Sequence, residues 1–147
     1  NWDLVIVGSG DALNSLEKFI AKAALENRID LIPATLEVEK FYESSDLFVI
    51  PSLWEGAPNS LSEAMSHGLP AIGFKVDGVT QLIRHGITGW LAPVVNDVSL
   101  SETLEVALSA PNKLKKMGKA AKKIALSINE NTIYNRWHKL IISIQER

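Results

Sequence analysis

The chain runs Leu47-Phe-Val-Ile50 and then Pro51-Ser-Leu-Trp-Glu-Gly-Ala-Pro-Asn-Ser-Leu-Ser-Glu63, and this junction indicates the architecture to expect. The first four residues form a short apolar run, which Pro51 ends because proline cannot donate a hydrogen bond to a central strand ladder. Beyond the loop, apolar and small residues recur with helical spacing at Leu61, Ala64, Met65 and Gly68. The junction therefore predicts a buried strand that leads through a loop into a helix with one buried face.

The same alternation of strand and helix extends through most of the chain. We expect strands at residues 4–7, 28–32, 47–50, 71–74 and 90–92, and helices at residues 11–27, 38–44, 60–67, 79–84, 99–108, 112–126 and 131–144. Such alternation predicts an α/β fold, a doubly wound parallel sheet flanked by helices. At 147 residues and 46% hydrophobic content, one domain over residues 1–147 is expected.

Composition excludes several classes of site and partner. Without cysteine, the chain has neither a disulfide framework nor a thiolate metal site. Its three histidines are scattered and no Asp-x-Asp pair is present, so we expect no metal. The net charge of −2 gives no support for a nucleic-acid surface. The sequence contains neither a secretory signal nor an apolar run of membrane-spanning length.

The start of the helix after Pro58 is where we expect a ligand, because carboxyl-end loops that lead into helices in parallel sheets bind ligands, especially anions. Gly56 lets a ligand approach the backbone closely. The amides of Asn59, Ser60 and Leu61 are helix-start donors without intrahelical partners. The helix dipole adds about 0.3–1 kcal/mol per anionic group, so these features favour a diphosphate.

Two glutamates flank this helix start. Glu55 and Glu63 would repel an anion unless they accept hydrogen bonds from neutral hydroxyl groups instead. A nucleotide sugar carries both a diphosphate and hydroxyl groups, so one carboxylate would accept from its ribose and the other from its hexose. Each glutamate also has a purely structural interpretation. Ser60-Leu-Ser-Glu63 fits a capping box, and Glu55 fits a solvated loop position.

Several segments of the chain, taken in order, resemble family 4 retaining glycosyltransferases. They are Val5-Ile-Val-Gly-Ser-Gly10, Tyr42-Glu-Ser-Ser-Asp-Leu-Phe-Val-Ile-Pro-Ser52, Glu55-Gly56 through Glu63-Ala64-Met65, Gly68-Leu-Pro-Ala-Ile72 and Gly86-Ile-Thr-Gly89. The resemblance runs from about Leu4 to Leu126. It implies the C-terminal, donor-binding half of the two-domain glycosyltransferase-B fold, with a Rossmann-like sheet. Each segment alone is a weak signal, but the ordered series is a strong one.

The resemblance implies a role for each residue of the junction. Glu63 matches the glutamate that holds the donor ribose, and Glu55 matches the one that faces the transferred sugar. The positions whose backbone meets the diphosphate and sugar match Gly56, Asn59, Ser60 and Leu61. The loop Ile32-Pro-Ala-Thr35 occupies the place of the base-binding loop, by position only. Gln81 stands where many relatives carry glutamate, and we leave it outside the predicted site.

The same resemblance implies half of an enzyme, a metal-independent hexosyltransferase. Its donor would be a nucleoside-diphosphate sugar, most often UDP-linked, bound as a substrate and not as a cofactor, and its acceptor a sugar, lipid or polysaccharide. The family's basic clamp for the diphosphate and its acceptor-binding domain precede Val5-Ile-Val-Gly8, so we expect both outside this chain, which begins at Asn1. Donor recognition without transfer is expected of the chain alone, and a cytoplasmic location, with peripheral membrane contact left open, is expected of the parent.

Proteins of unrelated function share this architecture, so each alternative function is compared with the sequence separately. A dinucleotide-binding domain requires Gly-x-Gly-x-x-Gly after the first strand, but Gly8-Ser-Gly10 is followed by Leu13 at the third glycine position. A phosphoacceptor receiver, a non-catalytic signalling module, requires an aspartate after the third strand, where this chain has Ile50-Pro-Ser52. A nucleotide-sugar epimerase of the same superfamily is the enzyme alternative.

Three further features stand outside the predicted site. Lys75 follows a strand and is interpreted as an exposed loop residue that could touch phosphate. The predicted helix at residues 112–126 carries six lysines on a solvated face, with contact to anionic lipid as the alternative. The last predicted helix carries an apolar stripe that we expect to be left unpartnered, formed by Ile133, Trp137, Leu140, Ile141 and Ile144.

Overall fold

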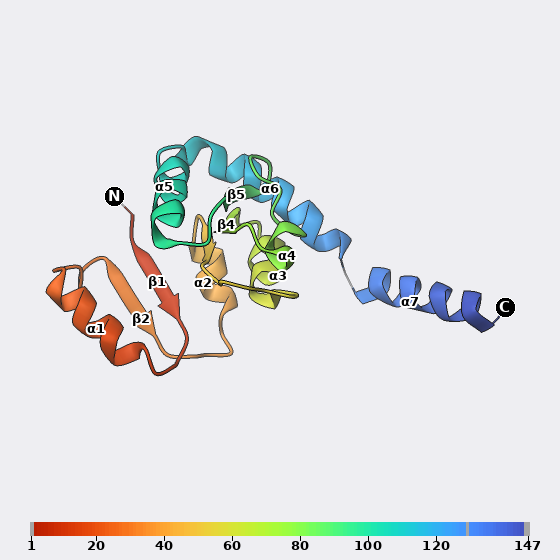
Figure 1. The fold of residues 1–147 in the computed structure, drawn as a ribbon, viewed down its shortest axis with the longest axis horizontal. Coiled ribbons are helices and arrows are strands. Elements are labelled where there is room, and N and C mark those ends of the chain that lie inside the picture. The colour runs from red at the N-terminus through yellow and green to blue at the C-terminus, as the bar shows by residue number, and fades with distance from the viewer. Residues whose placement is uncertain (1, 129, 146–147) are drawn as a thin grey trace. The chain divides into compact units, whose positions relative to one another are not determined.

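The computed structural model describes residues 2–128 and 130–145. The chain divides into two compact units, Asn1–Ser44 and Ser45–Arg147. The colour ramp of Figure 1 follows the chain from β1 in red to α7 in blue. Strands and helices alternate in both units, and all strand pairs are parallel, as the sequence predicts. The assignment of residues 1–147 to one domain stays a prediction.

The first unit is a two-stranded parallel sheet with two helices. Its elements are β1 (Leu4–Val7), α1 (Leu13–Lys22), β2 (Ile29–Ile32) and α2 (Glu39–Ser44). The strands pair in register from Leu4 opposite Ile29 to Val7 opposite Ile32. Gly8 N then donates to Ile32 O at 2.9 Å, which extends the pairing one residue past the strand ends. Both carboxyl ends therefore lie at one edge of this sheet.

Helix α1 ends earlier than the prediction of residues 11–27. Its last turn closes with Ala24 N donating to Ala21 O at 3.1 Å and Leu25 N donating to Ile20 O at 3.0 Å. This paired bonding is the Schellman motif, which requires a left-handed residue just after the helix. Ala24 takes that conformation, with φ of 53°. Glycine usually fills this position, so an alanine gave the sequence no stop signal.

The second unit is a three-stranded parallel sheet, in the order β3-β4-β5, with five helices among the residues that the structure describes. Its elements are β3 (Phe48–Ile50), α3 (Asn59–Ser66), β4 (Ala71–Phe74), α4 (Asp77–Thr80), β5 (Gly89–Ala92), α5 (Asp97–Leu108), α6 (Pro111–Ser127) and α7 (Glu130–Gln145). The central strand β4 is buried along its whole length. The core gathers residues from the sheet and from α3, α4 and α6: Ile50, Leu61, Met65, Ala71, Val79, Leu82, Ile83, Ala121 and Ala125.

Helices α3 and α6 pack closely through two glycines. A Cβ on Gly118 in α6 would overlap the carbonyl oxygen of Gly68, which follows α3, and would lie 3.3 Å from Pro70 Cδ. Gly68 itself has φ of 87° and closes α3 in the same Schellman pattern, with its N donating to Met65 O at 2.9 Å and Leu69 N donating to Ala64 O at 3.1 Å. The packing thus fixes the position of α3 from its carboxyl end.

The region predicted as a helix at residues 79–84 is helical only at Asp77–Thr80. One further α-type bond runs from Ile83 N to Val79 O at 2.9 Å, and Arg84 N then donates to the buried Thr88 Oγ1 at 2.8 Å and not to Thr80 O. Gly86, at φ of 76°, reverses the chain, and a Cβ on Gly89 would overlap the Ala71 carbonyl of β4. The Gly86-Ile-Thr-Gly89 segment is therefore a turn that leads tightly into the core strand β5.

Helix α7 carries the predicted apolar stripe on its surface. All five residues of that stripe are exposed, and Trp137 retains 61% of its accessible surface. In the described part of the chain, no helix combines the length and the apolar character needed to cross a bilayer.

Candidate functional site

Three loops meet at the carboxyl edge of the β3-β4-β5 sheet. Ile50 lies opposite Gly73 and Phe74 opposite Ala92, so the three strands end at nearly the same level. The loop of residues 51–58 leaves β3 there. Lys75, directly after β4, donates its backbone N–H to Ala92 O at 3.0 Å. Edges of this kind collect ligand-binding loops in parallel sheets, so this is where the chemistry of the second unit is expected.

The loop of residues 51–58 is held against the start of α4 by one backbone contact. Gly78 N donates to Glu55 O at 3.0 Å, and Gly78 is buried. Glu55 itself is half-buried, whereas Gly56 is exposed. A Cβ on Gly56 would meet no atom within 4 Å, so packing within the protein does not require glycine there. Gly56 thus leaves open space at the loop tip, as the predicted close approach of a ligand needs.

The first turn of α3 presents unbonded amides. The N-cap is Pro58, which has no side-chain capping bond, and Ser62 N donates to Pro58 O at 3.2 Å as the first bond of the helix. The amides of Asn59, Ser60 and Leu61 precede that bond and have no carbonyl four residues back within the helix. The capping-box interpretation of Ser60 is wrong, because Ser60 lies inside the helix and not at its cap.

The two faces of α3 divide the predicted site residues. Asn59, Ser60 and Glu63 are exposed, and Glu63 lies four residues after Asn59 and three after Ser60, so it neighbours both on the helix surface. Leu61 has no accessible surface and packs in the core. The Glu63 carbonyl accepts from His67 N at 3.1 Å and from Ser66 Oγ at 2.7 Å, which ties the backbone of Glu63 to the end of the helix.

The structure places Glu55 and Gly56 in the loop before α3, Asn59, Ser60 and Glu63 at exposed positions of α3, and Leu61 in the core. Sequence reasoning missed Gly78, whose absence of a side chain lets α4 touch the loop. The signal was present in Asp77-Gly-Val-Thr80, a glycine at the start of a short helix after a buried strand. Gln81, left outside the prediction, is exposed at the C-cap of α4.

The first unit has a separate cleft at the end of its own strands. Its volume is about 210 Å³, and it is lined by Ile6, Gly8, Ser9, Gly10, Ala12, Leu13, Leu16, Leu31 and Ile32. The lining is apolar apart from the Gly8-Ser-Gly10 turn.

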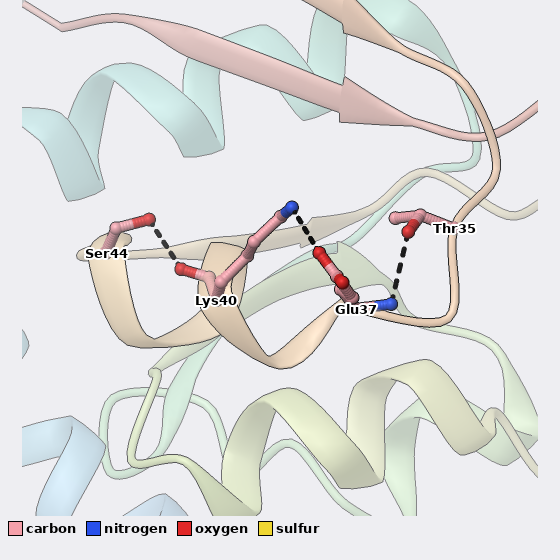
Figure 2. Close-up of polar contacts among 4 residues, drawn as sticks. All are labelled: Thr35, Glu37, Lys40 and Ser44. Carbon is pink, nitrogen blue, oxygen red and sulfur yellow. Dashed lines mark hydrogen bonds and ion pairs between the residues drawn. The ribbon is translucent and has the colours of Figure 1, made fainter.

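The loop after this cleft leads into α2 through a short polar chain, shown in Figure 2. Thr35 Oγ1 accepts from Glu37 N at 3.1 Å, and Lys40 Nζ lies 2.8 Å from Glu37 Oε2. The hydrogen bond from Lys40, and then its positive charge, hold the pKa of the Glu37 carboxyl below its usual range. Ser44 Oγ donates to Lys40 O at 2.8 Å at the end of the helix. These contacts connect the loop at residues 35–37 with α2.

Among the described residues, no group of three or more histidine and carboxylate side chains is placed to hold a metal ion. Lys75 is exposed at the sheet edge, in agreement with its interpretation as a loop lysine. The six lysines of α6 are exposed as well, and the helix contains no acidic residue.

Comparison with known proteins finds a matching family model and several relatives. Residues 1–124 match the family model described as glycosyl transferases group 1. An uncharacterized glycosyltransferase of Haemophilus influenzae is 30% identical over 142 residues, which cover 96% of this chain and 40% of that protein. A UDP-Gal:alpha-D-GlcNAc-diphosphoundecaprenol alpha-1,3-galactosyltransferase of Escherichia coli is 36% identical over 95 residues, 64% of this chain and 24% of that protein.

A solved structure resembles the fold over nearly the whole chain. It is the pneumococcal O-GlcNAc transferase GtfA in complex with UDP and GlcNAc, which superposes with a TM-score of 0.84 and is 27% identical. The match covers 99% of this chain and 30% of that one. This chain thus spans less than half the length of each of these relatives.

Proposed function

Because this chain belongs to the glycosyl transferases group 1 family, we propose that it forms the donor-binding part of a retaining hexosyltransferase. Family and glycosyltransferase-B fold are both as the sequence predicts. The donor in this proposal is a nucleoside-diphosphate sugar, most simply a UDP-sugar, and the acceptor is a sugar, lipid or polysaccharide. The observation that carries the proposal is the start of α3, where three unbonded amides stand between two glutamates.

The amides of Asn59, Ser60 and Leu61 would receive the diphosphate. They point out of the first turn of α3, where the helix dipole favours an anion by about 0.3–1 kcal/mol per charge. As the bond from the sugar to the diphosphate breaks, negative charge grows on the departing oxygen. Amide N–H groups already held in place stabilise this charge more in the transition state than in the bound nucleotide sugar. This difference lowers the barrier to transfer.

The two glutamates would bind the neutral parts of the donor. In this proposal Glu63, on the exposed face of α3, accepts hydrogen bonds from the ribose, and Glu55, at the loop tip, faces the transferred hexose. Two relatives support a UDP-linked donor: the Escherichia enzyme carries UDP-Gal in its name, and the pneumococcal structure holds UDP and GlcNAc. The proposal requires no metal or cofactor.

Transfer itself is proposed for the larger protein. The chain spans 40% of the Haemophilus relative and 30% of the pneumococcal transferase, so we assign donor binding to these 147 residues and the acceptor site to a partner domain. Basic groups that neutralise the diphosphate would come from outside the chain as well. Peripheral contact of the parent with a membrane fits the six exposed lysines of α6.

Chemical-shift mapping with UDP tests the proposal on the chain itself. We expect the amides of residues 56–63 to shift at millimolar UDP, because a helix start by itself favours an anion by only about 0.3–1 kcal/mol per charge. A mapped site far from Gly56 would refute the donor-site assignment. Sugar transfer to an acceptor by the parent separates a transferase from an epimerase, which would isomerise the donor, and from a signalling module, which would only bind it.

A further inference from the structure

The contact between Gly78 and the loop of residues 51–58 leaves no room for a side chain. A Cβ on Gly78 would lie 2.6 Å from both Glu55 O and Gly56 O, and 2.8 Å from Glu55 C. All three of these are backbone atoms, so a rotamer change cannot relieve the overlap. The φ angle of Gly78 lies outside the left-handed region, and the glycine is therefore required by space and not by backbone conformation.

The two partners of this contact differ in how firmly they are held. On the α4 side, Val79 is fully buried, and the helix is tied to β4 through Val76, which accepts from Thr80 N at 2.9 Å and donates to Phe74 O at 2.8 Å. On the loop side, the bond from Gly78 N to Glu55 O is the one backbone hydrogen bond found for residues 53–57 in the described part of the chain. The start of α4 is thus the fixed surface against which the loop rests.

We propose that Gly78 is a positioning residue that sets where the Glu55–Gly56 peptide lies, and hence where the Glu55 side chain starts. The hydrogen bond fixes the distance between α4 and the loop, and the missing side chain permits that distance. Gly56 has no comparable packing role, since its own Cβ would meet nothing within 4 Å. The consequence for donor binding rests on the proposed function, whereas the effect on the loop does not.

The first test measures the contact in the unaltered chain. A scalar coupling transmitted through the hydrogen bond between Gly78 N and Glu55 C′ should be detectable by NMR. The Gly78 amide should also exchange with solvent more slowly than that of Asp77, which is exposed in the same helix. A missing coupling together with fast exchange would overturn the proposal, and this measurement does not depend on any variant folding.

The second test adds one methyl group. Gly78→Ala should shift the amides of residues 53–58 while the β3-β4-β5 strands keep their shifts, and it should abolish the coupling. Thr80→Ala is the matched control, because it removes a surface hydroxyl that bonds Asp77 O at 2.9 Å in the same short helix. The control should leave the loop unchanged. Unchanged loop shifts in Gly78→Ala would overturn the positioning role.

The third test asks what the displaced loop does to the ligand, with UDP and UDP-glucose as probes. Gly78→Ala should lower the affinity for UDP-glucose relative to that for UDP by roughly tenfold, the effect of losing one hydrogen bond to a charged group. Thr80→Ala should leave that ratio as it is. A displaced loop with an unchanged ratio would overturn the link from Gly78 to sugar recognition. Failure of the unaltered chain to bind either probe would instead count against the proposed function, with the positioning role decided by the first two tests.

Discussion

Gly118 in α6 lies directly against the carbonyl oxygen of Gly68, two residues after the end of α3. A glycine inside a helix costs about 1 kcal/mol relative to alanine. Here the glycine permits a backbone approach that no other residue allows. Because the exposed face of α3 carries Asn59, Ser60 and Glu63, this contact far from the ligand edge also sets the position of the candidate site.

Gly118→Ala should destabilise the second unit strongly. The added Cβ would overlap a backbone oxygen, so α6 must move away from α3, and overpacking of this kind costs about 1–3 kcal/mol or more. Urea unfolding followed by the fluorescence of buried Trp90 measures the loss. Lys119→Ala, on the exposed surface of the same helix, should change stability by less than about 0.5 kcal/mol. Equal effects of the two substitutions would contradict the proposed packing.

The left-handed position of each Schellman motif should be more stable with glycine than with alanine, so exchanging the two residues should have opposite effects on stability at Ala24 and Gly68. Ala24→Gly should stabilise the first unit by about 0.5–1 kcal/mol, because relief of the left-handed alanine exceeds the added chain entropy of glycine. Gly68→Ala should destabilise the second unit by about 1 kcal/mol for the reverse reason. Hydrogen exchange of amides in each unit reports the change. Ala21→Gly, inside α1, should destabilise and serves as the control for the effect of glycine itself.

Glu63→Ala should weaken UDP binding by roughly tenfold or more, since a hydrogen bond to a charged group is worth about 1.5–3 kcal/mol. Glu55→Ala should spare UDP and weaken UDP-glucose, because Glu55 is assigned to the hexose. Calorimetry on the full-length parent distinguishes the two. If Glu63→Ala lowered thermal stability and left UDP affinity intact, Glu63 would be a structural residue only.

The contact between Lys40 and Glu37 predicts a local pH dependence. The pKa of Glu37 is lowered in the folded chain. The ion pair therefore stabilises the start of α2 fully at a pH above the unfolded pKa of glutamate, and this stabilisation is lost as the pH falls through the folded pKa. Carbon-detected NMR titration of the Glu37 carboxyl should give a midpoint below about 4.3, the ordinary glutamate value. Lys40→Met should return it toward that value, and 1 M salt should do so in part. A midpoint unaffected by Lys40→Met would show that the pair does not form in solution.

Helix α7 should make the chain associate at high concentration. Ile133, Trp137, Leu140 and Ile144 recur at alternating spacings of four and three, and all are exposed. Sedimentation should show mass rising with concentration, and Leu140→Asp should abolish the rise. Asn135→Asp adds the same charge at an exposed polar position of that helix and should not. A monomer at every concentration, with Trp137 shielded from quenchers, would contradict an unpartnered stripe.

Local sequence pattern was enough to predict most of this fold. Strands β1 and β4 have the predicted limits, and β3 and α3 differ from the prediction by a residue at most at each end, because apolar spacing and proline carry that information within a few positions. The end of α1 was missed because Ala24 holds a conformation that its chemistry does not favour. The predicted end of α4 at residue 84 was missed in part because Thr88, four residues further on, accepts from Arg84 N.

The candidate site divides in the same way. Glu55, Gly56 and Glu63 lie in one continuous segment, so a pattern within that segment is enough to propose them as site residues. Gly78 enters from a different element, and its contact with Glu55 joins positions that no local periodicity relates. The Ser60 cap failed for a subtler reason, since Pro58 had already taken the N-cap position one residue before the predicted start.

The turn at Gly86-Ile-Thr-Gly89 bears on how such proteins lose activity. Its residues are required by the fold itself. Gly86 reverses the chain, the buried Thr88 hydroxyl accepts a hydrogen bond, and Gly89 lets the backbone lie against Ala71. None of these contacts reaches the loop tip or the exposed face of α3. Substitutions at positions 55 and 63 would therefore not affect folding of the turn, and selection for folding would still keep the turn residues. Under the roles proposed for Glu55 and Glu63, a descendant that keeps the turn but has lost both carboxylates would be an intact scaffold without donor recognition.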